Sequence, residues 1–153
     1  MEKRGISRID IENKISRVGD YVKIDYLNRA LKEPLDFDTK KFVLGKLSDI
    51  YETRGMFTEA GRLMRISADI NTTFENKIND FVRSGNLFIK GVRFDEADAS
   101  FRKATGVSNT IQKVKVSYSR KDAYVSHALF YLKKDKRRQA LELYEKILGF
   151  DLN

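Results

Sequence analysis

Residues 41–74 read KFVLGKLSDIYETRGMFTEAGRLMRISADINTTF, and this stretch decides the fold. Apolar or small residues recur three or four positions apart on both sides of Gly55, which is the period of an amphipathic helix and not that of a strand. Arg54-Gly55 marks a tight turn between the two segments. The stretch therefore predicts a helix, a short turn and a second helix.

The same arrangement returns twice further along the chain. It recurs in residues 78–111, with the break at Gly91, and in residues 121–153, with the turn at Asp135. Three matches in register are hard to obtain by chance. They indicate a repeat protein, in which each helical hairpin is too small to bury its apolar face alone and packs against its neighbours.

A weaker unit precedes these three, in residues 5–38. Gly19 and Tyr21 form a glycine-turn-aromatic string between two helical segments, and the second segment ends before Pro34, as helices usually do. The four units cover almost the whole chain. Residues 1–153 are therefore predicted to form a single all-α domain.

Small and aromatic residues have separate roles in this pattern. Small residues allow neighbouring helices to approach, and aromatic residues fill the space between hairpins. We therefore expect six aromatic side chains to belong to the core, namely Phe81, Phe88, Phe94, Phe101, Tyr131 and Tyr144.

The segment before the last unit, TGVSNTIQKVKVSYSR (105–120), is longer than the repeat requires. Its apolar residues keep a spacing of three or four, which predicts a longer first helix capped by Ser108 or Asn109. The alternation in VKVSYS also permits a short strand. We discount the strand because it would have no partner in an all-helical chain.

The repeated strings resemble the tetratricopeptide repeat, whose unit is about 34 residues of helix, turn and helix. The most diagnostic string of that family has an aromatic residue, a pair such as Glu-Ala, a large residue and a small residue. It stands here as Phe57, Glu59-Ala60, Met64 and Ser67, and again as Phe94, Glu96-Ala97, Phe101 and Ala104. The last unit departs from it, with Arg137 and Gln139 before Ala140. The resemblance implies a right-handed α-solenoid of antiparallel helix pairs with about three to four repeats.

In proteins of that family, the first helices of successive repeats line a concave groove that receives an extended peptide or a helix. The family's groove positions carry over to Asn13, Arg17, Lys46, Asp49, Thr53, Asn79, Arg83, Asn86, Lys90, Ser126, Leu129 and Lys133. Basic and amide side chains prevail, so the resemblance implies a protein or peptide partner that is acidic. The expected function is a protein-protein interaction scaffold or adaptor, similar to a co-chaperone.

One branch of the family clamps the C-terminal carboxylate of chaperone peptides at five groove positions. These positions hold Ile9, Asn13, Lys46, Asn79 and Arg83 here, and only Asn13 and Arg83 match the usual residue types. A full clamp is therefore not expected. Arg83 remains a candidate site for an acidic group, because a guanidinium binds carboxylate or phosphate through two hydrogen bonds.

The charge of the chain favours an anionic partner. Thirty Lys and Arg residues against 22 Asp and Glu give a net charge of +8. Much of this charge lies in a C-terminal basic patch, which consists of Lys113, Lys115, Arg120, Lys121, Lys133, Lys134, Lys136, Arg137 and Arg138. The patch predicts, as an alternative function, a nucleic-acid-associated protein that contacts phosphates.

Residues for catalysis or metal binding are scarce. The chain has no cysteine, which excludes disulfides and thiolate ligands. His127 is the only histidine, and it takes the helix position of Leu47 in the clearest repeat, so we expect it to be packed. No glycine-rich phosphate loop and no triad spacing occur. We therefore expect no enzyme activity, no metal site and no cofactor.

Two expectations concern location and assembly. The N-terminus has no apolar stretch of signal-peptide length, and no segment approaches the roughly 20 apolar residues of a membrane span. We expect a cytoplasmic protein without a membrane partner. Beyond the last helix no further helix follows to cover Leu141, Leu148, Phe150 and Leu152. An uncovered face of this kind favours self-association or the docking of a partner helix, and we expect a homodimer through the C-terminal end.

Overall fold

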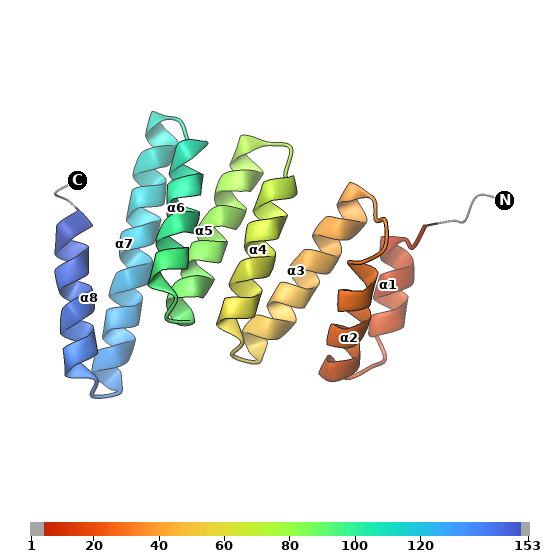
Figure 1. Cartoon of the computed structure of the whole chain (residues 1–153), viewed down its shortest axis with the longest axis horizontal. Helices are drawn as coiled ribbons and strands as arrows, with labels where there is room; N and C mark the ends of the chain where they lie inside the picture. Colours follow the sequence, from red (N-terminus) through yellow and green to blue (C-terminus); the bar gives the residue numbers. More distant parts are fainter. Residues whose placement is uncertain (1–4, 151–153) are drawn as a thin grey trace.

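The computed structural model describes residues 5–150, and within this range the chain forms eight helices and no strand. The helices are α1 (Arg8–Ile15), α2 (Asp20–Ala30), α3 (Phe37–Thr53), α4 (Phe57–Ile70), α5 (Phe74–Lys90), α6 (Phe94–Gly106), α7 (Thr110–Lys133) and α8 (Arg137–Phe150). Consecutive helices form hairpins that follow one another in a row, with α1 at one end and α8 at the other (Figure 1). The all-α class and the succession of helical hairpins are confirmed.

Three of the hairpin turns share one backbone conformation. Each has a single residue in the left-handed region, namely Gly55 (φ 75°), Val92 (φ 60°) and Asp135 (φ 57°). Each also has the same 2.8 Å hydrogen bond, donated by the next backbone N–H to a carbonyl in the last turn of the preceding helix. The acceptors are the carbonyls of Tyr51, Phe88 and Tyr131. The repeat is therefore present in the backbone and not only in the side-chain pattern.

The break in the third hairpin lies one residue later than expected, at Val92 instead of Gly91. Gly91 has an ordinary φ of −83° and serves a different purpose. A Cβ atom there would stand 2.6 Å from Thr58 Oγ1 and 3.1 Å from Thr58 N. Glycine at this position therefore allows the turn to approach the first residues of α4.

The longer first helix of the last hairpin is confirmed. Helix α7 has 24 residues and begins after Asn109. The Asn109 side chain accepts a hydrogen bond from Gln112 N, and the Gln112 side chain accepts one from Asn109 N, both at 2.9 Å. This capping box fixes the start of the helix, and residues 114–119 are helical instead of forming the alternative strand.

The buried side chains form three clusters along the row of hairpins. An N-terminal cluster joins α1, α2 and α3, and includes Ile11, Leu27 and Leu47. A small middle cluster consists of Ala60, Met64 and Leu87. A larger C-terminal cluster runs from the end of α4 to α8. This cluster contains all six aromatic residues expected in the core. Four are buried, namely Phe81, Phe88, Phe101 and Tyr131, and two are partly buried, namely Phe94 and Tyr144.

The end of the last helix differs in part from expectation. Leu141 and Leu148 are exposed, as predicted. Phe150 is instead partly buried, because its ring lies 5.3 Å from Tyr124 and is covered by the Arg120 guanidinium at 3.6 Å. Leu152 lies outside the described residues. In the described part of the chain, no helix combines the length and apolar character that crossing a bilayer requires.

Candidate functional site

Helices α5 and α7, the first helices of the last two hairpins, leave a pocket between them. Its volume is about 470 Å³, within the range of sites that hold a small molecule or a large side chain. Its lining residues are Phe57, Asn86, Ile89, Lys90, Ala123, Ser126, His127 and Phe130. Three expected groove residues, Asn86, Lys90 and Ser126, are therefore brought together here.

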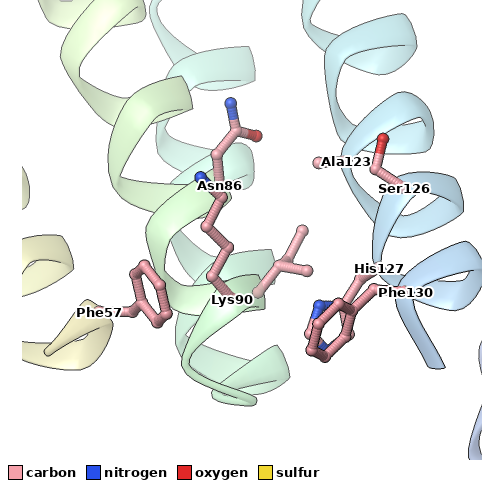
Figure 2. A pocket seen from close by; sticks show the side chains of 8 residues that line it. Phe57, Asn86, Lys90, Ala123, Ser126, His127 and Phe130 are labelled. Carbon is pink, nitrogen blue, oxygen red and sulfur yellow. The ribbon is translucent and has the colours of Figure 1, made fainter. Parts of the chain in front are cut away.

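Apolar walls enclose most of this pocket. Phe57 comes from the first turn of α4, while His127 and Phe130 project from α7 on the opposite side (Figure 2). The Lys90 ammonium lies 5.8 Å from the centroid of the Phe57 ring, which is the range of a cation-π contact. A ligand would therefore meet aromatic surface on two sides and one cation at the rim.

Two buried polar atoms in the pocket lack a hydrogen-bond partner among the described residues. They are Asn86 Oδ1 and His127 Nε2. Leaving such an atom unsatisfied costs about 1–3 kcal/mol, and native proteins retain few of them. Both atoms are buried, so a ligand would reach them only if neighbouring side chains moved. A polar ligand group that paired with them would then recover this energy.

The His127 ring is packed as expected, with 7% of its surface exposed. Its centroid lies 4.5 Å from that of Tyr131 and 6.1 Å from that of Phe94. Burial lowers the pKa of His127, and the positive charge of Lys136 lowers it further. The imidazole is therefore neutral at pH 7, when it has one nitrogen that donates and one that accepts.

A second pocket extends the same groove towards the first turns of α5 and α7. It has a volume of about 360 Å³ and includes Asn79 and Val82 from α5, and Lys115 and Ser119 from α7. We call the two pockets together the α5–α7 groove. The groove runs along both helices, and its lining includes apolar side chains, amides, two lysines and the Glu75 carboxylate.

The α3 side of the expected groove is occupied by ion pairs within the chain. The Arg83 guanidinium contacts the Asp49 carboxylate and lies 3.5 Å from Glu52. Lys90 Nζ also lies 3.5 Å from Glu52 Oε1. An acidic ligand at Arg83 would have to displace two carboxylates, so the structure gives no support to an anion site centred on this residue.

The remaining groove positions are not brought to the pocket. Asn13 and Arg17 are exposed on and just after α1, at the other end of the row (Figure 1). Lys46 is exposed on α3. Leu129 and Lys133 are exposed on α7 but line neither pocket of the groove.

The structure divides the predicted basic patch into two groups. Lys113, Lys115, Arg120 and Lys121 lie in the first half of α7, and the other five residues surround the turn between α7 and α8. At ~1.5 Å per residue, Lys115 and Lys133 are about 27 Å apart along the helix. The nine residues therefore do not form one continuous patch.

Arg120 has a structural role in this region. Asp98 Oδ1 accepts hydrogen bonds from Arg120 Nη2 at 3.1 Å and Tyr124 Oη at 2.7 Å, and Asp98 Oδ2 accepts one from Lys146 Nζ at 2.8 Å. Burial alone would raise the pKa of Asp98, but the hydrogen bonds from Lys146 and Tyr124 and the charge of Arg120 lower it below its ordinary value. This cluster ties α6, α7 and α8 together.

The apolar walls of the pocket, Phe57, Ile89, Ala123 and Phe130, were not predicted from the sequence as part of a site, because the helical period does not separate core residues from residues that line a cavity. One available signal was His127, a polar side chain at a core position. Ser84 takes the same position in the preceding hairpin, but its hydroxyl donates to the Gly61 carbonyl at 2.8 Å. His127 Nε2, by contrast, has no hydrogen-bond partner in the described structure.

No protein-family model matches this chain, and no curated protein matches its sequence. The helical-repeat architecture thus rests on the shared turns and on the packing of neighbouring helices. Between residues 5 and 150, no three histidine or carboxylate side chains gather where they would hold a metal ion.

Proposed function

We propose that this chain is an interaction scaffold of the tetratricopeptide type, a right-handed superhelix that binds a segment of another protein along the α5–α7 groove. The observation that carries the proposal is the 470 Å³ pocket, which Asn86 and His127 line together with apolar side chains. An extended segment would insert one side chain there and continue towards Asn79 and Lys115. Peptide-binding clefts commonly combine such a side-chain pocket with a groove for the backbone.

The chemistry of the pocket narrows the side chain that it accepts. Phe57, Ile89 and Phe130 favour an aromatic or long apolar stem. Asn86 and His127 favour a polar tip that donates a hydrogen bond, such as the hydroxyl of tyrosine or the amide of glutamine. The net charge of +8 favours acidic residues elsewhere in the bound segment.

The test begins with peptides of about 12 residues selected on the folded protein from a random displayed library. Fluorescence anisotropy then compares their affinity for the wild type and for Ala123→Leu, which fills the pocket. We expect the substitution to weaken binding by about 10-fold or more. Ala99→Leu is the matched control, because Ala99 is a partly exposed alanine of α6 that lines neither pocket of the groove.

Two results would count against this function. Peptides that bind Ala123→Leu as tightly as the wild type do not use the pocket. A library that yields no binder at all leaves the groove without the proposed role.

Association with nucleic acid is a second proposal, supported by the exposed cations at the α7–α8 turn. The side chains of Arg137 and Arg138 are 87% and 90% exposed. A single-stranded RNA should bind with a steep dependence on salt. Replacing the five basic residues of the turn by glutamine should abolish this binding, while Ala123→Leu leaves it unchanged; the five are Lys133, Lys134, Lys136, Arg137 and Arg138. Salt-independent or undetectable RNA binding would remove this proposal.

A further inference from the structure

The last hairpin exposes apolar residues at positions that are covered in an earlier hairpin. Positions are compared by counting from the left-handed turn residues Gly55 and Asp135. Gly61 and Leu141 each stand six residues after their turn, on α4 and α8. Gly61 lies against the next helix, since a Cβ atom there would be 3.0 Å from the Phe88 ring of α5. Leu141 is 59% exposed.

A second pair of positions behaves in the same way. Ala68 on α4 is fully buried, and Leu148, at the corresponding position on α8, is 72% exposed. The extensive contact between α4 and α5 covers the first of these residues. Within the described chain, no helix takes the place of α5 beside α8.

Helix α7 shows the same loss of cover when it is compared with α5. Ile89 stands three residues before Val92 and lines the pocket between α5 and α7, where it is 1% exposed. Its counterpart Leu132, three residues before Asp135, is 45% exposed. We call Leu132, Leu141 and Leu148, together with the exposed Tyr118 and Leu129 on the same side of α7 as Leu132, the C-terminal face.

The charge around this face indicates what covers it. Over residues 110–150, ten basic side chains face four acidic ones, and eight basic side chains remain when Arg120 and Lys146, which pair with Asp98, are set aside. Two copies of the chain joined through this face would bring two such basic regions together, which like-charge repulsion opposes. A helix with an apolar stripe and acidic residues beside it would gain from both the apolar contacts and the charge.

We propose that the C-terminal face binds an acidic amphipathic helix of a partner protein. The helix would lie across α7 and α8 as α5 lies across the preceding hairpin, with its apolar stripe on Leu132, Leu141 and Leu148 and its carboxylates near the lysines of α7. This interface is separate from the α5–α7 groove, which opens on the other side of α7. A scaffold with both surfaces would hold two partners at once.

The test uses displayed helical peptides of 17 residues, the length of α5. Each has leucine at positions three and four apart, and glutamate, glutamine or lysine at random on the flanks of this stripe. Peptides selected on the wild type are measured by fluorescence anisotropy against Leu141→Gln/Leu148→Gln, which removes apolar surface without changing the charge. Ile66→Gln is the matched control, because Ile66 is an apolar residue of α4 with 46% exposure.

We expect glutamate to exceed lysine in the selected flanks and the double variant to bind about 10-fold more weakly or worse. Ile66→Gln and the pocket variant Ala123→Leu should bind as the wild type does. A second double variant, Leu129→Gln/Leu132→Gln, should also weaken binding, and circular dichroism verifies that each variant remains helical.

Several outcomes would overturn the proposal. These are the absence of any selected helix, flanks enriched in lysine, and binding that both double variants retain. Binding that is lost in Ala123→Leu would move the site to the groove. Sedimentation of the wild type alone should show a monomer, and a dimer that Leu141→Gln/Leu148→Gln dissociates would identify a second copy as the occupant.

Discussion

Gly85 of α5 faces the Phe101 ring of α6, and its replacement by alanine tests how closely the two helices must approach. A Cβ atom at Gly85 would stand 2.5 to 2.8 Å from three atoms of this ring. The optimal separation between two non-bonded carbon atoms is about 3.5–4.0 Å. Phe101 is 2% exposed, so its ring has to move within a packed core, and an extra carbon in such a core costs about 1–3 kcal/mol.

An opposing effect reduces this cost. Alanine is favoured over glycine inside a helix by about 1 kcal/mol. Because three ring atoms lie within 2.8 Å of the added carbon, we expect the upper part of the overpacking cost, about 2–3 kcal/mol, so Gly85→Ala should lower the free energy of unfolding by about 1–2 kcal/mol. Gly45 is a matched control, because it also lies inside a helix but has no atom within 4 Å of its Cβ position. Gly45→Ala should raise the free energy of unfolding, by up to about 1 kcal/mol.

Urea unfolding followed by circular dichroism at 222 nm measures both changes, with the slope of the transition as a check that the folded state is unaltered. The two substitutions should have opposite signs. The reasoning is refuted if Gly85→Ala is as stable as the wild type or more stable.

Three further predictions concern strain, the buried ion cluster and pH. Val92→Gly should raise the free energy of unfolding by about 0.5–1 kcal/mol, because a β-branched residue in the left-handed region costs about 1–2 kcal/mol. The Val92 side chain is 52% exposed, so little packing is lost with it. An unchanged free energy of unfolding in urea would contradict this prediction. Asp98→Asn should lower the free energy of unfolding by about 2–4 kcal/mol at pH 7, because Arg120 and Lys146 lose the carboxylate with which both of them pair. The pKa of Asp98 is lowered in the folded state, so its contribution to stability is present above its ordinary pKa of 3.8 and is lost as pH falls through the folded value. A difference from the wild type that does not shrink as pH falls below 3.8 would contradict this. The pKa of His127 is also lowered, so the unfolded chain takes up the proton first, and stability should decrease as pH falls below about 6.5. NMR should show this single imidazole titrating below pH 6.5.

The hairpins were predictable because helix periodicity and small residues are local features of the sequence. The position of the left-handed residue was not, since Gly91 is the obvious candidate and Val92 an improbable one. The structure shows that Gly91 is needed for its contact with Thr58, so the valine is left with the strained conformation. Local propensity therefore predicted where the turn lies, and packing between hairpins determined which residue adopts the left-handed conformation.

The candidate site was predictable only in part. Asn86, Lys90 and Ser126 were expected in a groove, and they line the pocket. The pairing of Arg83 with Asp49 was not foreseen, because ion pairs between successive hairpins depend on how far the helices are displaced from one another. The apolar walls were missed for a related reason, since periodicity does not distinguish a buried residue from one that lines a cavity.

The division of the core into three clusters has a consequence for how the molecule responds to a ligand. None of the buried residues of α1 and α2 belongs to the cluster that holds α7 and α8, so the first hairpin can open without disturbing the last. Hydrogen exchange at α1 and α2 then proceeds through local opening, at a lower free energy than exchange at α5. A partner in the α5–α7 groove would slow hydrogen exchange in α5 and α7 and leave the exchange rates of α1 and α2 unchanged. Binding would therefore stabilise only the C-terminal part of the row of hairpins.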